Sequence, residues 1–346
     1  MSRIQKYRES LYRFIKDKSC LLEDQDVNNA QINTYIYNKI KENDLIFSIL
    51  LLTIMNSQNK KNHISMQGYY IASCIEFLNV SLSSIDNKNE IINKFNNDGY
   101  NKLHANLYFS SNRSLQQNLE SAKTVYHNLE SSNKNLESTK NTYQNNFQGL
   151  CNIILNSLSL YNNTIKTINQ FSDFKMNITN KSCNTTIIKW YLKNDDELKE
   201  KFKTFKQVSK ESINEYIDKK YISICELAMS LGWLLGGGEI KELPKLKKLS
   251  KYFGMMYKMA KDFENLTNDV KNGNVYTTNY VLNYGLQNGY EVFLNSKQKF
   301  IEESSMDTDI YTNTIKEIID TIEANVDMII DQTSPDLKST YSSKAQ

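Results

Sequence analysis

The sequence predicts an all-α protein, and three observations support that prediction. The chain of 346 residues holds only 2 prolines and 11 glycines, so few residues interrupt long helices. Apolar residues recur at spacings of three and four along most of the chain, which is the period of one buried helix face. No alternating run is long enough to argue for a sheet. With 40% apolar residues, the chain can also build a real core.

A polar segment over 1–30 is expected to precede one helical domain over 31–332, with a flexible tail over 333–346. The first helix of that domain is predicted over 31–56, where apolar residues keep helical spacing up to a polar stretch. The second is predicted over 65–87, because its apolar residues form one buried face.

The stretch 122–154 has the most regular spacing in the chain, with steps of four and three that form a heptad seam. Polar Asn133 and Lys140 interrupt one of its two rows. Buried polar groups in such seams set register and oligomeric state at a cost in stability. Two interpretations stay open: a long surface helix with a weak apolar stripe, or a helix that projects into a homodimer contact.

The rest of the chain also has helical spacing. Further helices are predicted over 150–173, 208–236 and 246–269, with two or three more in the last 70 residues. Between the first two, 175–207 is expected to mix an Asn-rich loop with a charged helix. Gly236, Gly237 and Gly238 follow a helix and predict its end, since glycine favours helix C-termini. They do not open a helix after a strand, so a phosphate-binding loop is not indicated.

Bulk composition excludes several classes of protein. Forty-two basic residues against 39 acidic give a net charge of +3, with no concentrated basic face for nucleic acid. The 5 cysteines are scattered without metal-site or disulfide spacing, which indicates a reducing compartment. The most apolar run, Leu45 to Met55, is about half the length of a membrane span. The charged N-terminus carries no secretory signal, so we expect a cytoplasmic protein.

Two carboxylate clusters are the strongest candidates for chemistry. Asp86 and Glu90 end one predicted helix, and Asp262, Glu264 and Asp269 end another. Carboxylates four residues apart share one helix face. Two such faces aimed at each other across a helical cavity would hold magnesium ions and a diphosphate between them. The competing interpretation is that these acids are solvated helix ends in ordinary ion pairs. The histidines lie outside any recognisable nucleophile motif.

Five segments in one order carry a resemblance to a known family. They are IEFLNVSLSSIDNKNE, NQFSDF, KKYISICELAMSLGWLLGGG, FGMMYKMAKDFENLTND and KNGNVYTTNY. Together they resemble the trans-isoprenyl diphosphate synthase, or polyprenyl synthetase, family over about 40–290. The resemblance implies an isoprenoid-synthase-like helical bundle around a central cavity, a dimer, and Mg²⁺ as cofactor. It also implies condensation of an allylic diphosphate with isopentenyl diphosphate.

The resemblance assigns roles residue by residue. Metal ligands would be Asp86, Glu90, Asp262 and Asp269. Catalytic positions would be Lys220, Gln170 and Asp173. Diphosphate would be bound by Lys220, Lys258, Lys261 and Lys271. Small residues near Ser81 and Leu82, a turn before the first motif, would leave a deep pocket for a longer product.

The chain also departs from the family pattern. Asn87 replaces the second aspartate of the first motif, Lys261 replaces the leading aspartate of the second, and Asn265 replaces its last. The stretch over 40–48 has no arginine where the family binds isopentenyl diphosphate. Diphosphate affinity rests on such basic forks and on metal bridges. Lys258 and Lys261 would either replace a metal by charge, or pair with Asp86 and Glu90 and close an empty site.

Three functions follow. The first is an isoprenoid-forming prenyltransferase, impaired by these losses, of the polyprenyl or geranylgeranyl diphosphate synthase type. The second is a catalytically inactive homologue that acts as a subunit or scaffold, as a homodimer or with a related synthase. The third is a one-substrate diphosphate lyase, which needs no isopentenyl site.

Overall fold

The computed structural model describes residues 3–18, 21, 27–57, 68–132, 139–306 and 310–333. It divides into two compact units. The first unit comprises Met1–Ser172, Ser223–Lys248 and Thr308–Ile315. The second comprises Asp173–Ile222, Leu249–Asp307 and Lys316–Gln346. Of the tail predicted over 333–346, Thr333 is the last residue of the final helix, and 334–346 lie outside the described residues.

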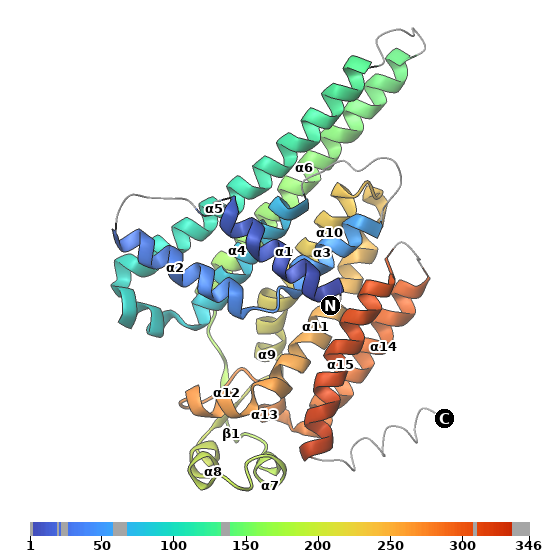
Figure 1. Ribbon diagram of the computed structural model, residues 1–346. Coiled ribbons are helices and arrows are strands. Elements are labelled where there is room, and N and C mark those ends of the chain that lie inside the picture. The colour runs from blue at the N-terminus through green and yellow to red at the C-terminus, as the bar shows by residue number, and fades with distance from the viewer. Residues whose placement is uncertain are drawn as a thin grey trace. The chain divides into compact units, whose positions relative to one another are not determined.

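The first unit is helical throughout its described residues. Its elements are α1 (Arg3–Asp17), α2 (Val27–Glu42), α3 (Ile46–Ser57), α4 (Gly68–Asp86), α5 (Lys88–Ser132), α6 (Thr139–Ser172), α10 (Ser223–Leu235) and η2 (Ile240–Glu242), with the beginning of α11 (Leu243–Glu264). In Figure 1 the paired helices α5 and α6 extend well past α3, α4 and α10. Within the described residues, no helix combines the length and apolarity needed to cross a bilayer.

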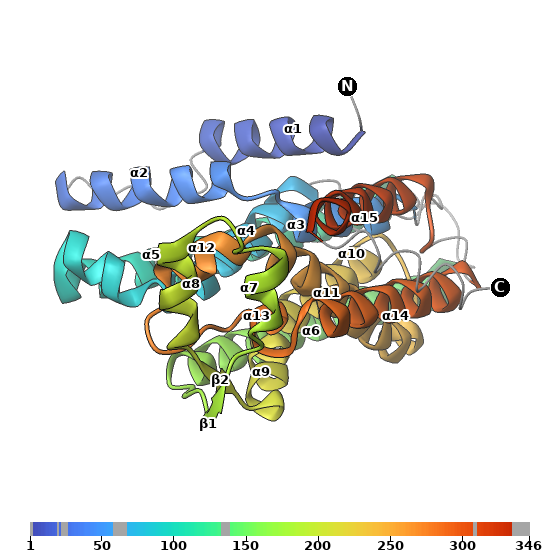
Figure 2. The ribbon, with the colours of Figure 1, turned by 90° about the horizontal axis from the view of Figure 1, so that it is seen from below.

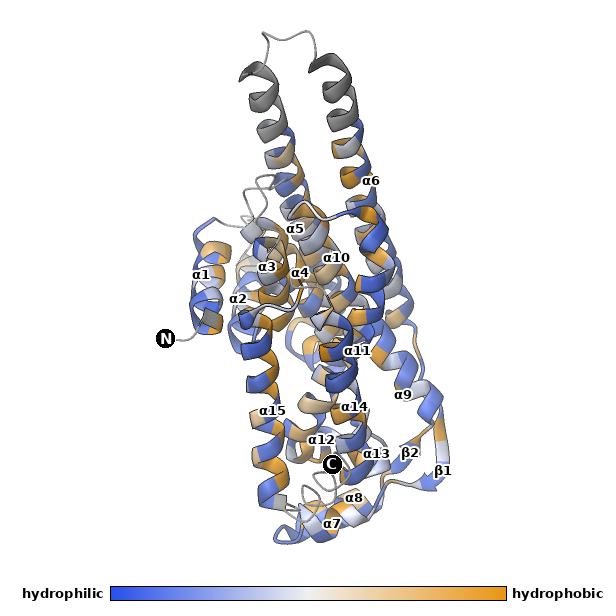
Figure 3. Cartoon of the chain, turned by 90° about the vertical axis from the view of Figure 1, so that its right-hand side faces the viewer, coloured by the Kyte–Doolittle hydropathy of each residue, from blue (hydrophilic) through white to orange (hydrophobic). Residues whose placement is uncertain are grey.

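The core of the first unit is built on α3 and α10, which are apolar over nearly all their length (Figure 3). They approach closely at Gly232, where an added Cβ would lie 2.6 Å from the carbonyl oxygen of Leu51. Helix α4 packs against α3 and along α5, and α6 packs against α10. Helices without a polar face are expected only where neighbours cover them on several sides.

Two predicted helices are each divided in the structure. The helix expected over 31–56 is broken between α2 and α3, where Leu45 has φ 57°. The single helix expected over 122–154 is wrong, because α5 ends at Ser132 and α6 begins at Thr139. Asn133 lies outside the described residues, and so do the side chains over 125–147. The structure therefore leaves the predicted seam and its dimer contact untested.

The second unit holds the remaining elements. They are β1 (Ile178–Ser182), α7 (Thr186–Trp190), α8 (Asp196–Lys203), β2 (Lys206–Val208), α9 (Lys210–Ile217), η1 (Asp218–Ile222), most of α11, α12 (Leu266–Asn272), α13 (Tyr280–Tyr284), α14 (Leu286–Ser305) and most of α15 (Asn313–Thr333). The prediction for 175–207 missed a small antiparallel sheet of β1 and β2, visible in Figure 2. Strands of five and three residues are too short to produce an alternating signal.

The predicted glycine stop is confirmed. Helix α10 ends at Leu235, the Gly238 N–H donates to the Trp233 carbonyl, and the Gly237 N–H donates to that of Leu234. Gly237 has φ 97°, a conformation that glycine adopts without a steric penalty. These paired bonds form a Schellman cap that satisfies the last carbonyls of the helix.

Candidate functional site

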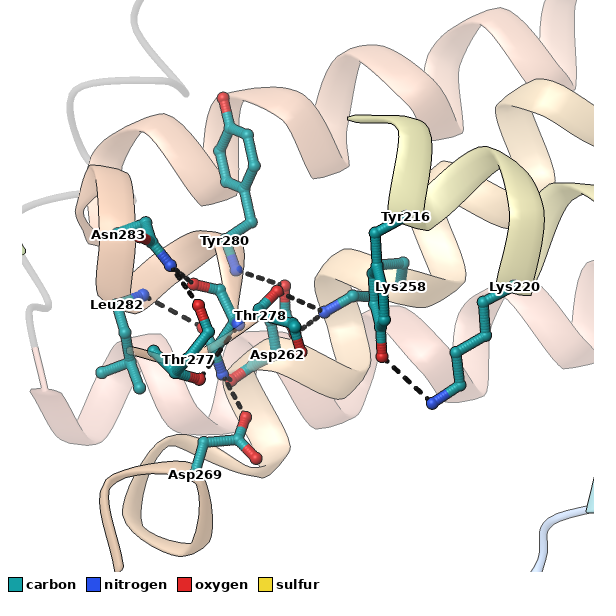
Figure 4. Close-up of polar contacts among 11 residues, drawn as sticks. Tyr216, Lys220, Lys258, Asp262, Asp269, Thr277, Thr278, Tyr280, Leu282 and Asn283 are labelled. Atoms are coloured by element: carbon teal, nitrogen blue, oxygen red, sulfur yellow. Dashed lines mark hydrogen bonds and ion pairs between the residues drawn. The ribbon is translucent and has the colours of Figure 1, made fainter. Parts of the chain in front are cut away.

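Lys258 and Asp262 from the second aspartate-rich segment meet Tyr216 from α9 inside the second unit (Figure 4), and Tyr221 from η1 also faces Lys258. Lys258 and Asp262 lie one turn apart on α11, so they project from the same face of the helix. Both are buried, with 2% and 3% of their surface exposed. Lys258 Nζ donates to Asp262 Oδ1, which makes them an internal ion pair.

The rest of the Lys258 ammonium is also covered. It lies 3.3 Å from the Thr278 carbonyl oxygen. It also faces two aromatic rings, with Nζ 5.8 Å from the ring centre of Tyr216 and 5.5 Å from that of Tyr221. Burial opposes its charge, but Asp262 and Tyr221 outweigh that effect and raise the pKa of Lys258. The lysine is therefore cationic at neutral pH.

Asp262 is held from three directions. Its Oδ2 accepts from the Tyr280 N–H at 2.8 Å, and its backbone carbonyl accepts from Asn279 Nδ2 at 2.8 Å. Burial raises the pKa of Asp262 to about 6, while Lys258 acts in the opposite direction. The carboxylate is therefore mostly ionised at pH 7, and the pair carries both charges. Each carboxylate oxygen of Asp262 already accepts a hydrogen bond from the protein.

Asn279 joins the second acid to this network. Its Nδ2 also donates to Asp269 Oδ2 at 2.7 Å, and its Oδ1 accepts from the Leu282 N–H at 3.0 Å as the cap of α13. Asn283 supports the same turn, because its Nδ2 donates to the carbonyls of Thr277 and Asn279. The loop before α13 is thus fixed against the end of α11 by amide side chains.

Lys220 reaches the same tyrosines from the other side. It lies in η1, a π-helical turn of the kind that often marks functional positions. Its Nζ is 3.1 Å from Tyr216 Oη and 5.3 Å from the ring centre of Tyr221. Two ammonium groups, of Lys220 and Lys258, therefore share the faces of the same two rings. We call Tyr216, Lys220, Tyr221, Lys258 and Asp262 the lysine–tyrosine cluster.

The other assigned lysines lie outside this cluster. Lys261 pairs with Glu264 at 2.7 Å, and its Nζ is 5.5 Å from the ring centre of Tyr257. The side chain of Lys271 is exposed on α12, and its backbone carbonyl accepts from Lys201.

The two acids of the first motif belong to the first unit. Asp86 ends α4 and Glu90 lies in the first turn of α5, and both are exposed in the first unit. Backbone bonds from Asn87 to Ser83 and from Ile91 to Asn87 continue the helical path, so the two acids share one face as predicted. Gln170 in the first unit and Asp173 in the second are also exposed.

The small residues before the first motif do not leave open space on the side of α5. Ser81 Oγ lies 3.2 Å from His104 Nδ1, and Ser84 Oγ lies 3.0 Å from Nε2. Ser84 donates its own hydrogen to the Ser81 carbonyl, so its Oγ accepts from Nε2–H and fixes that tautomer. Burial, with a smaller effect from Lys88, lowers the pKa of His104 to about 4. A neutral imidazole thus fills the place beside Ser81.

The residues of the second motif do not fit a magnesium ion as they are arranged. Magnesium requires near-octahedral oxygen ligands, most of them carboxylates, waters and phosphates. At Asp262 an ammonium group already neutralises the carboxylate. Among the residues that the structure describes, no three His, Cys, Asp or Glu side chains lie close enough together to hold a metal ion.

Comparison with known proteins supports the fold but not the chemistry. No family model and no curated protein matches the chain. Among solved structures, a geranyltransferase from Legionella pneumophila matches 93% of this chain and 95% of its own, with a TM-score of 0.57 and 11% identity. A putative farnesyl-diphosphate synthase from Marinomonas sp. MED121 matches 94% of this chain and 98% of its own, with a TM-score of 0.48 and 10% identity.

The fold is therefore the all-α fold of isoprenyl synthases, as the sequence resemblance implied. At 11% identity the likeness concerns the fold alone. Sequence reasoning missed Tyr216, Asn279 and Tyr280 as members of the site. Of these, Asn279 had a signal in the sequence, since Asn directly before an apolar run is a common helix cap.

Proposed function

We propose that this chain is a catalytically silent protein of isoprenyl-synthase fold that acts as a subunit or scaffold. The observation that supports this is the buried Lys258–Asp262 pair. Prenyl transfer needs cations at the second motif to neutralise the diphosphate as it leaves. The carboxylate of Asp262 is already neutralised by a lysine of the same helix and accepts a hydrogen bond from a backbone N–H. Its affinity for a further cation should therefore be low.

Prenyl transfer from an allylic diphosphate to isopentenyl diphosphate is the second candidate. It is favoured by the exposure of Asp86 and Glu90, which share one helix face and are accessible to magnesium. A one-substrate diphosphate lyase would use the same two acids. Both reactions still need a second source of positive charge, for which Lys220 is the candidate.

A turnover assay separates the three functions. Purified protein is incubated with allylic diphosphates and Mg²⁺, with and without labelled isopentenyl diphosphate, beside an active synthase as assay control. The silent function predicts neither elongated product nor released diphosphate. Elongated product would overturn it in favour of the synthase, and diphosphate release without elongation would overturn it in favour of the lyase. If turnover is found, Asp86→Asn should abolish it.

The assembly is tested separately. A scaffold of this fold is proposed to form a homodimer or to pair with a related active synthase. Light scattering on the purified full chain measures the first possibility. For the second, the turnover of an added synthase is measured with and without this chain. A monomer that leaves the added synthase unchanged would contradict the subunit role.

A further inference from the structure

We infer that the Lys258 ammonium is a built-in counter-ion, standing where Asp262 and the Thr278 carbonyl oxygen would otherwise hold a metal ion. This goes beyond the proposed function, because it concerns which cation the site accepts and does not depend on turnover. If the lysine takes the place of the metal ion, adding magnesium should not change the stability of the folded chain.

The surroundings of Nζ suit any small cation. One hydrogen of the ammonium is directed at Asp262 Oδ1 and another at the Thr278 carbonyl oxygen. The faces of Tyr216 and Tyr221 cover the remaining side and attract positive charge through their ring electrons. Oxygen donors of this kind are also the ligands that Mg²⁺ and Mn²⁺ prefer.

Asp262 is held by contacts that do not involve Lys258. The Tyr280 N–H holds Asp262 Oδ2, and Asn279 ties the Asp262 carbonyl to Asp269. Figure 4 shows this arrangement, with Asp262 held between Lys258 and the loop before α13. Shortening the lysine should therefore leave the acceptors in place and open a space lined by oxygen.

The test is Lys258→Gln, which removes the ammonium and adds an amide oxygen. Mn²⁺ binding is followed by electron paramagnetic resonance, and thermal stability is followed with Mg²⁺ or Mn²⁺ in the absence of any diphosphate. The wild-type Tm should not change with either cation. The Tm of the variant should rise by roughly 5 °C at saturating Mn²⁺, because the ion binds the folded state alone.

Two variants serve as controls. Lys258→Gln/Asp262→Asn lacks the carboxylate and should show no response to cations. Lys261→Gln removes a nearby half-exposed lysine, leaves the Lys258–Asp262 pair intact, and should behave as wild type. If Lys258→Gln is unfolded alone, Mn²⁺ should restore its helical circular dichroism. A variant that neither binds nor is stabilised by Mn²⁺ would overturn the inference, and so would an equal response from wild type or from the double variant.

Discussion

Lys258 donates to Asp262 one turn further along α11, and both side chains are buried, so the second aspartate-rich segment neutralises its own charge. The pair lies under the rings of Tyr216 and Tyr221, which leaves the ammonium with little contact with water. Desolvated ion pairs of this kind contribute modestly when intact but are costly when one partner is lost. Because of this asymmetry, substitutions of the two residues can measure their interaction.

Removing both charges of the pair should cost less than the sum of the costs of removing each one alone. Lys258→Met leaves the buried Asp262 carboxylate without its cation and should lower the free energy of unfolding by about 3–5 kcal/mol. Lys258→Met/Asp262→Asn leaves no charge, so its loss should be smaller than the sum of the single losses by about 2 kcal/mol. Urea unfolding of the four proteins measures the coupling. Additive losses would mean that the two groups do not interact.

Glu76 in the first unit predicts a loss of stability as the pH rises from about 4.5 to about 7. It is fully buried on α4, its Oε1 lies 2.5 Å from Ser48 Oγ, and its Oε2 has no hydrogen-bond partner among the residues that the structure describes. Ser48 has only one hydrogen and also bonds the Ala72 carbonyl, so a protonated Glu76 that donates to Ser48 satisfies the geometry best. Burial raises the pKa of Glu76 from 4.5 to about 7, with Ser48 lowering it and Asp44 adding to the increase.

The direction in which pH changes the stability follows from this increase in the pKa of Glu76. The raised pKa stabilises the folded state fully below pH 4.5, and that contribution is lost as pH rises to about 7. The loss is about 3 kcal/mol for this single group. Glu76→Gln keeps the shape without the titration and should flatten the dependence of Tm on pH over this range. Glu90→Gln, at an exposed position of α5, is the matched control and should leave the dependence unchanged. If Glu76→Gln titrates like wild type, Glu76 is not the group responsible.

Gly232 tests the close contact in the core of the first unit. A Cβ at this position would lie 2.6 Å from the carbonyl oxygen of Leu51, and the backbone there cannot move aside like a side-chain end. Gly232→Ala should therefore destabilise the protein by about 3 kcal/mol. Gly149→Ala on α6 meets nothing within 4 Å and should instead stabilise by about 0.5–1 kcal/mol. Equal effects in thermal unfolding would show that α3 and α10 are not in contact at this point.

Much of the fold could be predicted because its helices carry clear signals. The spacing of apolar residues predicts α4 within a few residues of its bounds, and Gly236–Gly238 predict the end of α10. The break at Leu45 could not be predicted, because leucine is a strong helix former and no Gly or Pro stands beside it. Tertiary packing decides the backbone conformation at such a position, and that packing cannot be read from a single sequence.

The site was predicted in part for a similar reason. Spacing places Lys258 and Asp262 on one face of a helix, and replacement of a metal by the charge of a lysine was one of two alternatives for this segment. The other alternative was that Lys258 and Lys261 pair with Asp86 and Glu90, whereas Lys258 pairs within its own helix. The orientation of Asp262 depends on Tyr280, whose N–H donates to its carboxylate from the start of α13. This contact joins residues that are distant in the sequence, so no local sequence pattern predicts it.

Calorimetric titration of a prenyl diphosphate into wild-type protein, with and without Mg²⁺, measures directly whether Lys258 has replaced the metal at Asp262. An affinity that does not change with Mg²⁺ is the predicted result, since the cation of this motif is already part of the chain. A clear increase in affinity on adding Mg²⁺ that is lost in Asp262→Asn would contradict the replacement of the metal by Lys258. It would favour a metal-dependent synthase instead.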